Sequence, residues 1–200
     1  MRNRPRTIRE KMWDRQVTGG WLMRRNIVLI GMMGAGKTAI GAELSRRLGR
    51  PLWDTDAEIE RAAAMTIPEI FARDGEEFFR ARESEVLARV LAGGDSIIST
   101  GGGSWMREAN RNRVAGNGVS VWLDCDLETL WQRVRSRPSR PLLQTADPRG
   151  TLERLISERG PVYALADIHI RAERGDAIED TASQVIAAIQ ASQPIILEAK

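Results

Sequence analysis

Short apolar runs alternate with longer amphipathic stretches along most of the chain. Apolar runs rich in β-branched side chains are typical of buried parallel strands. The first run is Asn26-Ile-Val-Leu-Ile30, and a shorter one begins at Leu52-Trp53. The runs that complete a set of five expected strands are 96–100, 119–123 and 168–170.

The stretches between these runs predict helices. Gly49 and Pro51 stop the first helix, and Asp126 is a typical N-cap residue for a later one. Three prolines and a glycine within 137–150 predict a loop there. The expected helices are about 37–48, 57–92 with breaks at Pro68 and Gly75, 105–115, 126–135, 151–158 and 178–191.

Strands that alternate with helices predict βαβ units and a parallel sheet. The fold class is therefore α/β, with three layers (αβα) around a five-stranded parallel sheet. In such sheets ligands bind beyond the carboxyl ends of the strands. The residues that directly follow each expected strand are therefore the first candidates for chemistry.

A glycine-rich loop follows the first strand. Residues 31–38 read Gly-Met-Met-Gly-Ala-Gly-Lys-Thr, which fits the G-x-x-x-x-G-K-[ST] pattern. Its glycines let backbone N–H groups face phosphate oxygens, Lys37 reaches the β- and γ-phosphates, and Thr38 ligates Mg²⁺. The chain has no guanine-selective Asn-Lys-x-Asp, so ATP is the expected nucleotide. The candidate ATP-binding residues here are Gly34, Ala35, Gly36, Lys37, Thr38 and Ala39.

Two carboxylates follow the second strand, at Asp54 and Asp56. Kinase chemistry uses one carboxylate to hold Mg²⁺ and another to orient and deprotonate an acceptor hydroxyl. The same spacing also occurs where an aspartate merely caps a helix or closes a turn. The pair alone leaves both interpretations open.

Other candidates lie farther along the chain. Arg80 and Glu83 are i, i+3 neighbours on a helix, so Glu83 steers Arg80 or the two form a solvated surface pair. The three glycines at 101–103 let a ligand approach the backbone, unless they form a plain turn. Arg159 follows a helix and either clamps a carboxylate or complements the helix C-terminus.

Arginines crowd the proline-containing loop, with Arg133 just before it and Arg140 within it. A loop of this kind suits a mobile lid that closes over the transferring phosphate and excludes water. A nucleic-acid patch would interleave aromatic residues or lysines, and residues 132–150 contain neither.

The composition of the 200 residues is that of a globular domain, with 42% hydrophobic and 28% charged residues. A single cysteine, Cys125, excludes an intrachain disulfide and favours a reducing cytoplasm. A single histidine, His169, excludes a histidine-rich metal site. The absence of an apolar run near 20 residues excludes a membrane span.

The net charge of +3 is unevenly distributed, because residues 1–26 carry +6 and the remainder sums to −3. We expect residues 1–24 to form a disordered basic arm, or Met23 to be the natural first residue. A basic arm also has the charge to bind nucleic acid or anionic lipid. The remaining divisions are a domain over 25–192, with its lid at about 137–150, and a C-terminal tail over 193–200.

Taken together, these segments resemble the shikimate kinase family. The matching pieces are the loop at 31–38, Asp54-Thr-Asp56, Asp74-Gly-Glu-x-Phe-Phe-Arg80-x-x-Glu83, Ser99-Thr-Gly-Gly-Gly103, Arg140-Pro-Leu-Leu143 and Arg159-x-Pro-x-Tyr163. Their order and spacing span about 27–191. The resemblance implies a P-loop fold like that of the nucleoside monophosphate kinases, and transfer of the ATP γ-phosphoryl group to the 3-hydroxyl of shikimate, a step towards chorismate and the aromatic amino acids.

The resemblance also implies a role for each candidate. Asp56 would hold the acceptor hydroxyls and act as base, with Lys37 and Arg140 as the other catalytic residues. Asp54 would reach Mg²⁺ through water, beside Thr38. Arg133 would stack near adenine, and Arg140 would meet the phosphates. The shikimate-binding residues would be Asp56, Arg80, Gly102, Gly103 and Arg159, with Glu83 supporting Arg80.

The family's usual adenine-side segment contains a proline that Ala172-Glu-Arg174-Gly-Asp176 lacks, so Arg174 has no assigned role. The rival interpretations are another small-molecule kinase, such as a gluconate or nucleoside monophosphate kinase, and a non-catalytic nucleotide- or nucleic-acid-binding module. The paired arginines and the triple glycine favour shikimate. We expect a cytoplasmic monomer that uses ATP and Mg²⁺ and binds neither nucleic acid nor membrane.

Overall fold

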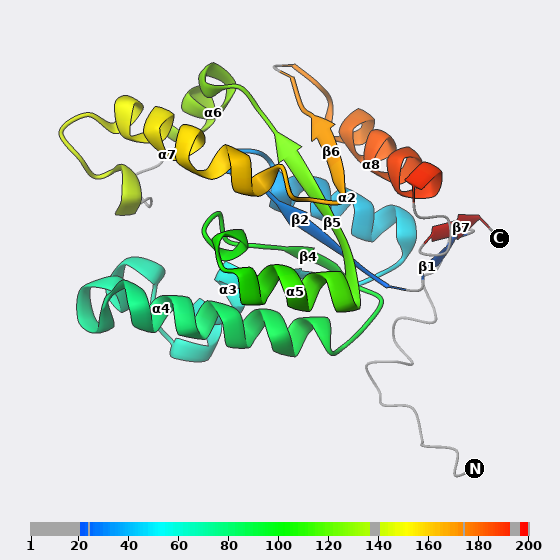
Figure 1. The fold of residues 1–200 in the computed structure, drawn as a ribbon, viewed down its shortest axis with the longest axis horizontal. Coiled ribbons are helices and arrows are strands. Elements are labelled where there is room, and N and C mark those ends of the chain that lie inside the picture. The colour runs from blue at the N-terminus through cyan, green and yellow to red at the C-terminus, as the bar shows by residue number, and fades with distance from the viewer. Residues whose placement is uncertain (1–20, 24, 137–140, 174, 193–196, 200) are drawn as a thin grey trace, which may run out of the picture.

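The computed structural model describes residues 21–23, 25–136, 141–173, 175–192 and 197–199. Its main feature is a five-stranded sheet in the order β3-β4-β2-β5-β6, with every neighbouring pair parallel (Figure 1). This confirms the fold class expected from the alternating pattern. The strands are β2 (Asn26–Ile30), β3 (Leu52–Asp54), β4 (Ile97–Ser99), β5 (Gly118–Asp124) and β6 (Ile168–Arg171).

Helices cover both faces of the sheet, with α2 and α8 packed together on one side and α5 and α7 on the other (Figure 1). The helices are α2 (Lys37–Leu48), α3 (Thr55–Ala63), α4 (Ile67–Leu91), α5 (Glu108–Asn117), α6 (Leu127–Val134), α7 (Pro148–Tyr163) and α8 (Ile178–Ser192). Two short 3₁₀ turns are η1 (Ser104–Met106) and η2 (Pro141–Leu143).

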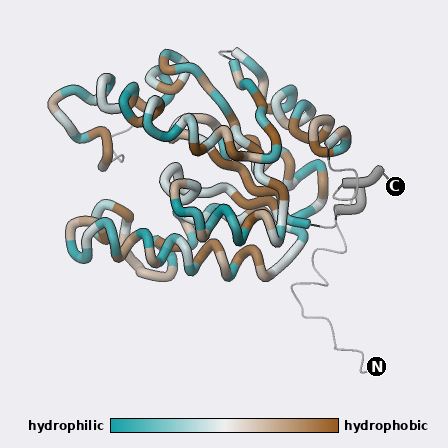
Figure 2. Tube along the Cα trace, in the orientation of Figure 1, coloured by the Kyte–Doolittle hydropathy of each residue, from teal (hydrophilic) through white to brown (hydrophobic). Residues whose placement is uncertain are grey.

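The central strand explains why the first apolar run has no alternation. Ile27, Val28, Leu29 and Ile30 are all 0% exposed, because both faces of β2 are covered. Figure 2 shows hydrophobic residues gathered along the inner strands, whereas the helices alternate hydrophobic and hydrophilic residues. The core thus holds the carboxyl ends of the strands at one edge, where the candidate residues lie.

The long helical stretch at 57–92 divides differently from the prediction. The chain separates α3 from α4 at Ala64, which has a left-handed φ of 51°, and α4 begins after the capping residue Thr66. Pro68 does not break the helix, because it lies in the first turn, where its missing N–H is not needed. Gly75 does interrupt α4, with φ 81° and ψ 174°.

The predictions for the loop and the termini also need correction. Helix α7 begins at Pro148 rather than 151, capped by Asp147, and continues through Pro161 to Tyr163. Residues 21–23 and 197–199 form a small antiparallel pair, β1 (Trp21–Met23) with β7 (Leu197–Ala199), which the division into arm and tail did not anticipate. Residues 1–20 and the lid segment 137–140 lie outside the described residues.

Candidate active site

The glycine-rich loop joins β2 to the first turn of α2. Gly31, Gly34 and Gly36 have φ of 136°, 84° and 94°, a region that favours glycine. At Gly31 a Cβ would also lie 2.7 Å from the carbonyl oxygen of Leu123. The loop therefore wraps the N-terminal end of α2, where backbone N–H groups and the helix dipole attract phosphate. Lys37 Nζ donates to the carbonyls of Gly31, at 2.8 Å, and Met32, at 2.9 Å.

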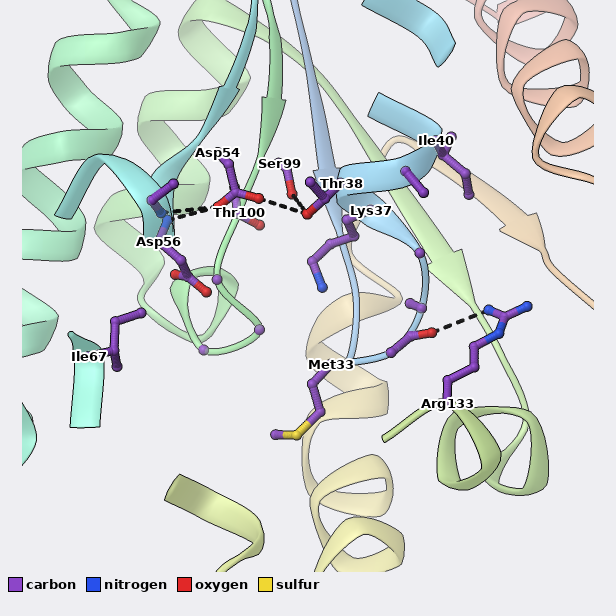
Figure 3. Close-up of a pocket in the computed structure, with 18 of the residues that line it drawn as sticks. Met33, Lys37, Thr38, Ile40, Asp54, Asp56, Ile67, Ser99, Thr100 and Arg133 are labelled. Atoms are coloured by element: carbon purple, nitrogen blue, oxygen red, sulfur yellow. Dashed lines mark hydrogen bonds between the residues drawn. The ribbon is translucent and has the colours of Figure 1, made fainter. Parts of the chain in front are cut away.

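Oxygen atoms converge beside this loop from three elements. The Thr38 hydroxyl donates to Asp54 Oδ2 at 2.7 Å and lies 3.3 Å from the Ser99 hydroxyl (Figure 3). The other oxygen of Asp54 caps α3, accepting from the N–H groups of Asp56 and Ala57. Asp54 is thus a helix cap through one oxygen, and its other oxygen belongs to the polar cluster. The capping interpretation of this aspartate is confirmed, and a role in holding Mg²⁺ stays a prediction.

Asp56 lies in the first turn of α3 and lines the same pocket (Figure 3). Gly101, which follows β4, faces it closely: a Cβ at Gly101 would lie 2.6 Å from Asp56 Oδ1 and 2.5 Å from Glu83 Oε1. Only glycine leaves room for these two carboxylates. The first glycine of the triplet is therefore required by the side chains around it, which sequence reasoning had not identified.

Arg80 and Glu83 form an ion pair on α4, with 3.0 Å between Nη1 and Oε2. Glu83 is fully buried and the Arg80 side chain is only 13% exposed, which excludes a solvated surface pair. Burial raises the pKa of Glu83, Arg80 opposes that rise, and the charge of Asp56 adds to it. A Cβ at Gly103 would lie 2.5 Å from Arg80 Nη1, so this glycine makes room for the guanidinium.

Arg159 reaches the pocket from α7. Its Nη1 donates to the carbonyl oxygen of Gly102 at 3.2 Å, and the hydroxyl of Tyr163 donates to the same oxygen. Arg159 therefore lies inside α7, not after the end of a helix. Tyr163 lies four residues after Arg159 on α7, a spacing that places both side chains on one helix face.

Arg133 reaches the opposite side of the glycine-rich loop. It extends from α6 and donates through Nη1 to the carbonyl of Gly34 at 3.2 Å (Figure 3). Arg140 and Arg174 lie outside the described residues. Ala172 and Asp176 also line the pocket, and they belong to the segment compared with the family's adenine-side segment. Sequence reasoning missed two further lining residues, Ile178 and Thr181.

All the described candidates line one pocket of about 1160 Å³, larger than a typical single-ligand site. It also contains apolar residues that lie outside the quoted motifs, among them Ile67 and Phe71. The predicted residues that it brings together are Gly34, Ala35, Gly36, Lys37, Thr38, Ala39, Asp54, Asp56, Arg80, Gly102, Gly103, Arg133 and Arg159.

Among the residues that the structure describes, no cluster of three or more His, Cys, Asp or Glu side chains is placed to hold a metal ion. No helix in the same part of the chain has the length and apolar character to cross a membrane. A metal at Thr38 and Asp54 would therefore take further ligands from water or phosphate, which is usual for Mg²⁺.

Comparison with known proteins gives a consistent result. The family model described as shikimate kinase matches residues 33–190. A shikimate kinase of Ruegeria pomeroyi is 51% identical over 178 residues, covering 89% of this chain and 91% of that protein. A solved shikimate kinase of Acinetobacter baumannii, in complex with shikimate, is 37% identical with a TM-score of 0.82, covering 85% of this chain and 95% of that one.

A more distant structure bears on the rival interpretation. A gluconokinase of Sinorhizobium meliloti has a TM-score of 0.54 at 15% identity, covering 86% of this chain and 96% of that one. At that identity the likeness shows a common fold and nothing about the substrate.

Proposed function

The chain belongs to the shikimate kinase family, and from that premise we propose how its pocket transfers the γ-phosphoryl group of ATP to the 3-hydroxyl of shikimate, giving shikimate 3-phosphate and ADP. It is an ATP-dependent kinase acting on shikimate, in chorismate and aromatic amino acid biosynthesis. The observation that supports the residue roles is one pocket with a phosphate-binding loop on one side and two arginines with an aspartate on the other.

The nucleotide lies along the glycine-rich loop. Backbone N–H groups of residues 34–39 and the N-terminal end of α2 bind its phosphates. Lys37 turns from the carbonyls of Gly31 and Met32, which it contacts in this structure, towards the β- and γ-phosphates. Arg133 covers the nucleoside side, and Arg140 meets the phosphates from the lid.

Shikimate lies opposite, with its carboxylate between Arg80 and Arg159. A guanidinium presents paired donors that match the two oxygens of a carboxylate. Glu83 holds Arg80 in place at 3.0 Å, and the backbone of Gly102 and Gly103 lines the same end of the pocket. Asp56, whose Oδ1 lies beside Gly101, receives the ring hydroxyls.

The donor set at Thr38 and Asp54 fits Mg²⁺, because a hydroxyl and a carboxylate oxygen lie 2.7 Å apart beside the phosphate-binding loop. Thr38 would hold the ion directly and Asp54 through water. The ion, when bound, neutralises the charge that develops on the phosphates.

The residues of the chain hold the two substrates in position and provide one proton acceptor. Asp56 accepts the proton of the 3-hydroxyl as that oxygen forms its bond to the γ-phosphorus, and the bond between the phosphorus and the ADP oxygen breaks. Lys37 and Arg140 stabilise the negative charge on the transferred group. Holding both substrates in line supplies much of the remaining acceleration.

We also propose that the protein is a cytoplasmic monomer and that it binds neither nucleic acid nor membrane.

A coupled assay of ADP release with shikimate, gluconate and nucleoside monophosphates tests which acceptor the protein uses, and Lys37→Met serves as the inactive control. Turnover with shikimate alone is expected. Turnover with gluconate but not shikimate would overturn the assignment, and the absence of turnover with every acceptor would favour a non-catalytic nucleotide-binding module.

A further inference from the structure

The carbonyl oxygen of Gly102 joins the glycine triplet to α7 through hydrogen bonds. It accepts a hydrogen bond from the Tyr163 hydroxyl and another from Arg159 Nη1, at 3.2 Å. The two donors are four residues apart on α7 and therefore share one helix face. Arg159 faces the pocket, whereas Tyr163 is 1% exposed and lies behind it.

Tyr163 remains a hydrogen-bond donor under all ordinary conditions. Its burial raises the pKa of the phenol above its usual value, so the hydroxyl keeps its proton. Its ring packs near that of Trp122, with the centroids 5.9 Å apart. The phenol thus has a fixed position from which it holds the Gly102 carbonyl.

Fixing that carbonyl also fixes the backbone that follows it. The chain contains no cis peptide bond among its described residues, and a trans peptide points its N–H opposite to its C=O. The N–H of Gly101 donates to the Thr55 hydroxyl. Within the described residues, the N–H groups of Gly102 and Gly103 donate to no protein acceptor, so they have the capacity to bind a ligand.

Tyr163 also contacts the phosphate-binding loop. Its hydroxyl lies 3.6 Å from Met32 Sδ, and the carbonyl of Met32 accepts from Lys37 Nζ at 2.9 Å. A Cβ placed on Gly102 would lie 3.5 Å from the Gly31 carbonyl and 3.6 Å from the Met33 nitrogen. The glycine triplet therefore rests directly against the phosphate-binding loop, with Tyr163 in contact with both.

We propose that Tyr163 is a positioning residue that couples the acceptor and nucleotide sites, because its hydroxyl holds the Gly102 peptide against the phosphate-binding loop. This inference rests on the proposed function. Without the hydroxyl, Arg159 is the one donor to the Gly102 carbonyl that remains among the described residues, and that arginine must also bind the acceptor carboxylate. Both the placement of Arg159 and the contact between the two loops then loosen.

The test compares Tyr163→Phe with Trp105→Phe. Trp105 is buried and donates through Nε1 to the Val162 carbonyl at 3.0 Å, so this control also removes one hydrogen bond to α7 without touching Gly102. Each protein is assayed for kcat, for the KM of shikimate and of ATP, and for melting temperature. Calorimetry measures the Kd of ADP with and without saturating shikimate, and the ratio of the two Kd values is the coupling factor.

We expect Tyr163→Phe to raise the KM of shikimate about tenfold, the effect of one lost hydrogen bond, with the KM of ATP changing less than about twofold. Its coupling factor falls towards one, while Trp105→Phe keeps the parent's factor even where it melts earlier. A parent factor of one, equal effects in both variants, or a Tyr163→Phe protein that does not fold would each overturn the inference. Absence of shikimate turnover in the parent would instead overturn the proposed function.

Discussion

Arg80 and Glu83 lie one helical turn apart on α4, and the carboxylate of this 3.0 Å ion pair has no exposed surface. Glu76 contacts the same guanidinium from its outer side, at 3.2 Å. The arginine is therefore held on two sides before any substrate arrives. A clamp whose geometry is fixed in advance loses little side-chain entropy when it binds a carboxylate.

Replacing Arg80 should weaken the binding of shikimate and leave the binding of ATP nearly unchanged. Arg80→Ala is expected to raise the KM of shikimate about 30- to 100-fold, since a charge-assisted hydrogen bond contributes about 2–3 kcal/mol, while the KM of ATP changes little. Arg80→Lys, which keeps a charge beside Glu83, should give a smaller rise. Steady-state kinetics with each substrate varied provides the measurement.

Arg82 offers a matched control for that variant. It lies two residues farther along α4, pairs with Glu85 at 2.8 Å and is 47% exposed. Arg82→Ala should leave both KM values unchanged. Equal losses for shikimate and ATP in Arg80→Ala would contradict the assignment of Arg80 to the carboxylate.

Asp56→Asn should lower kcat by about 10²- to 10⁴-fold, the usual contribution of a general base, while ADP still binds. The amide has nearly the same shape but does not accept the acceptor's proton. Single-turnover rates and ADP titration separate the two effects. Asp74→Asn, a change at an aspartate paired with Arg73, is the control and should be neutral. A nearly normal kcat in Asp56→Asn would exclude it as the base.

Gly103→Ala should also weaken shikimate binding, because it displaces Arg80. The added Cβ would lie 2.5 Å from Arg80 Nη1, so the guanidinium must move and the KM of shikimate should rise several-fold. Gly160→Ala in α7 is the comparison, because a Cβ there meets nothing within 4 Å. It should raise the free energy of unfolding by about 0.5–1 kcal/mol, as expected for alanine in a helix. Unchanged kinetics in Gly103→Ala would show that Arg80 tolerates displacement.

Thr38→Ala should raise the Mg²⁺ concentration that gives half-maximal activity, because the variant loses the hydroxyl that lies 2.7 Å from Asp54. Thr38→Ser keeps a hydroxyl and should stay close to the parent. Activity is measured against Mg²⁺ at saturating ATP and shikimate. If the two variants shift the Mg²⁺ dependence equally, the hydroxyl is not a metal ligand.

Glu83 should make folding stability depend on pH. Burial raises its pKa in the folded protein above the ordinary value of 4.5. Its contribution to stability is therefore complete below about pH 4.5 and is lost as the pH rises through the raised folded-state pKa. Between pH 4.5 and 7, the parent should lose more free energy of unfolding than Glu83→Gln. Denaturant titrations at several pH values measure this, with the exposed Glu85→Gln as control; parallel curves for parent and Glu83→Gln would contradict it.

Much of the fold could be predicted because its signals are local. The run at 26–30 becomes β2 without change, since a strand buried on both faces must be apolar throughout. The helix at 37–48 ends where predicted, at the left-handed Gly49. Helix α7 was underestimated because Pro148 and Gly150 usually mark loops, yet a proline at a helix start is compatible with it.

The candidate site was predictable only as far as motifs define it. The residue types that contact phosphates and carboxylates follow from chemistry and order along the chain. What Gly101 and Gly103 make room for depends on Asp56, Glu83 and Arg80, which come from other elements. The spacing of residues within one segment does not predict contacts between segments, such as the hydrogen bond from Tyr163 to Gly102.

The two carbonyl contacts of Lys37 have a consequence for inhibitor design. Its ammonium group already donates to two carbonyl oxygens, at 2.8 and 2.9 Å. An anionic compound that binds Lys37 must replace those hydrogen bonds, so its binding free energy includes only the difference between the new and the old bonds. A neutral compound that leaves the lysine where it is avoids that exchange. Screening campaigns against this enzyme can therefore look for affinity in the acceptor half of the pocket, without copying a triphosphate.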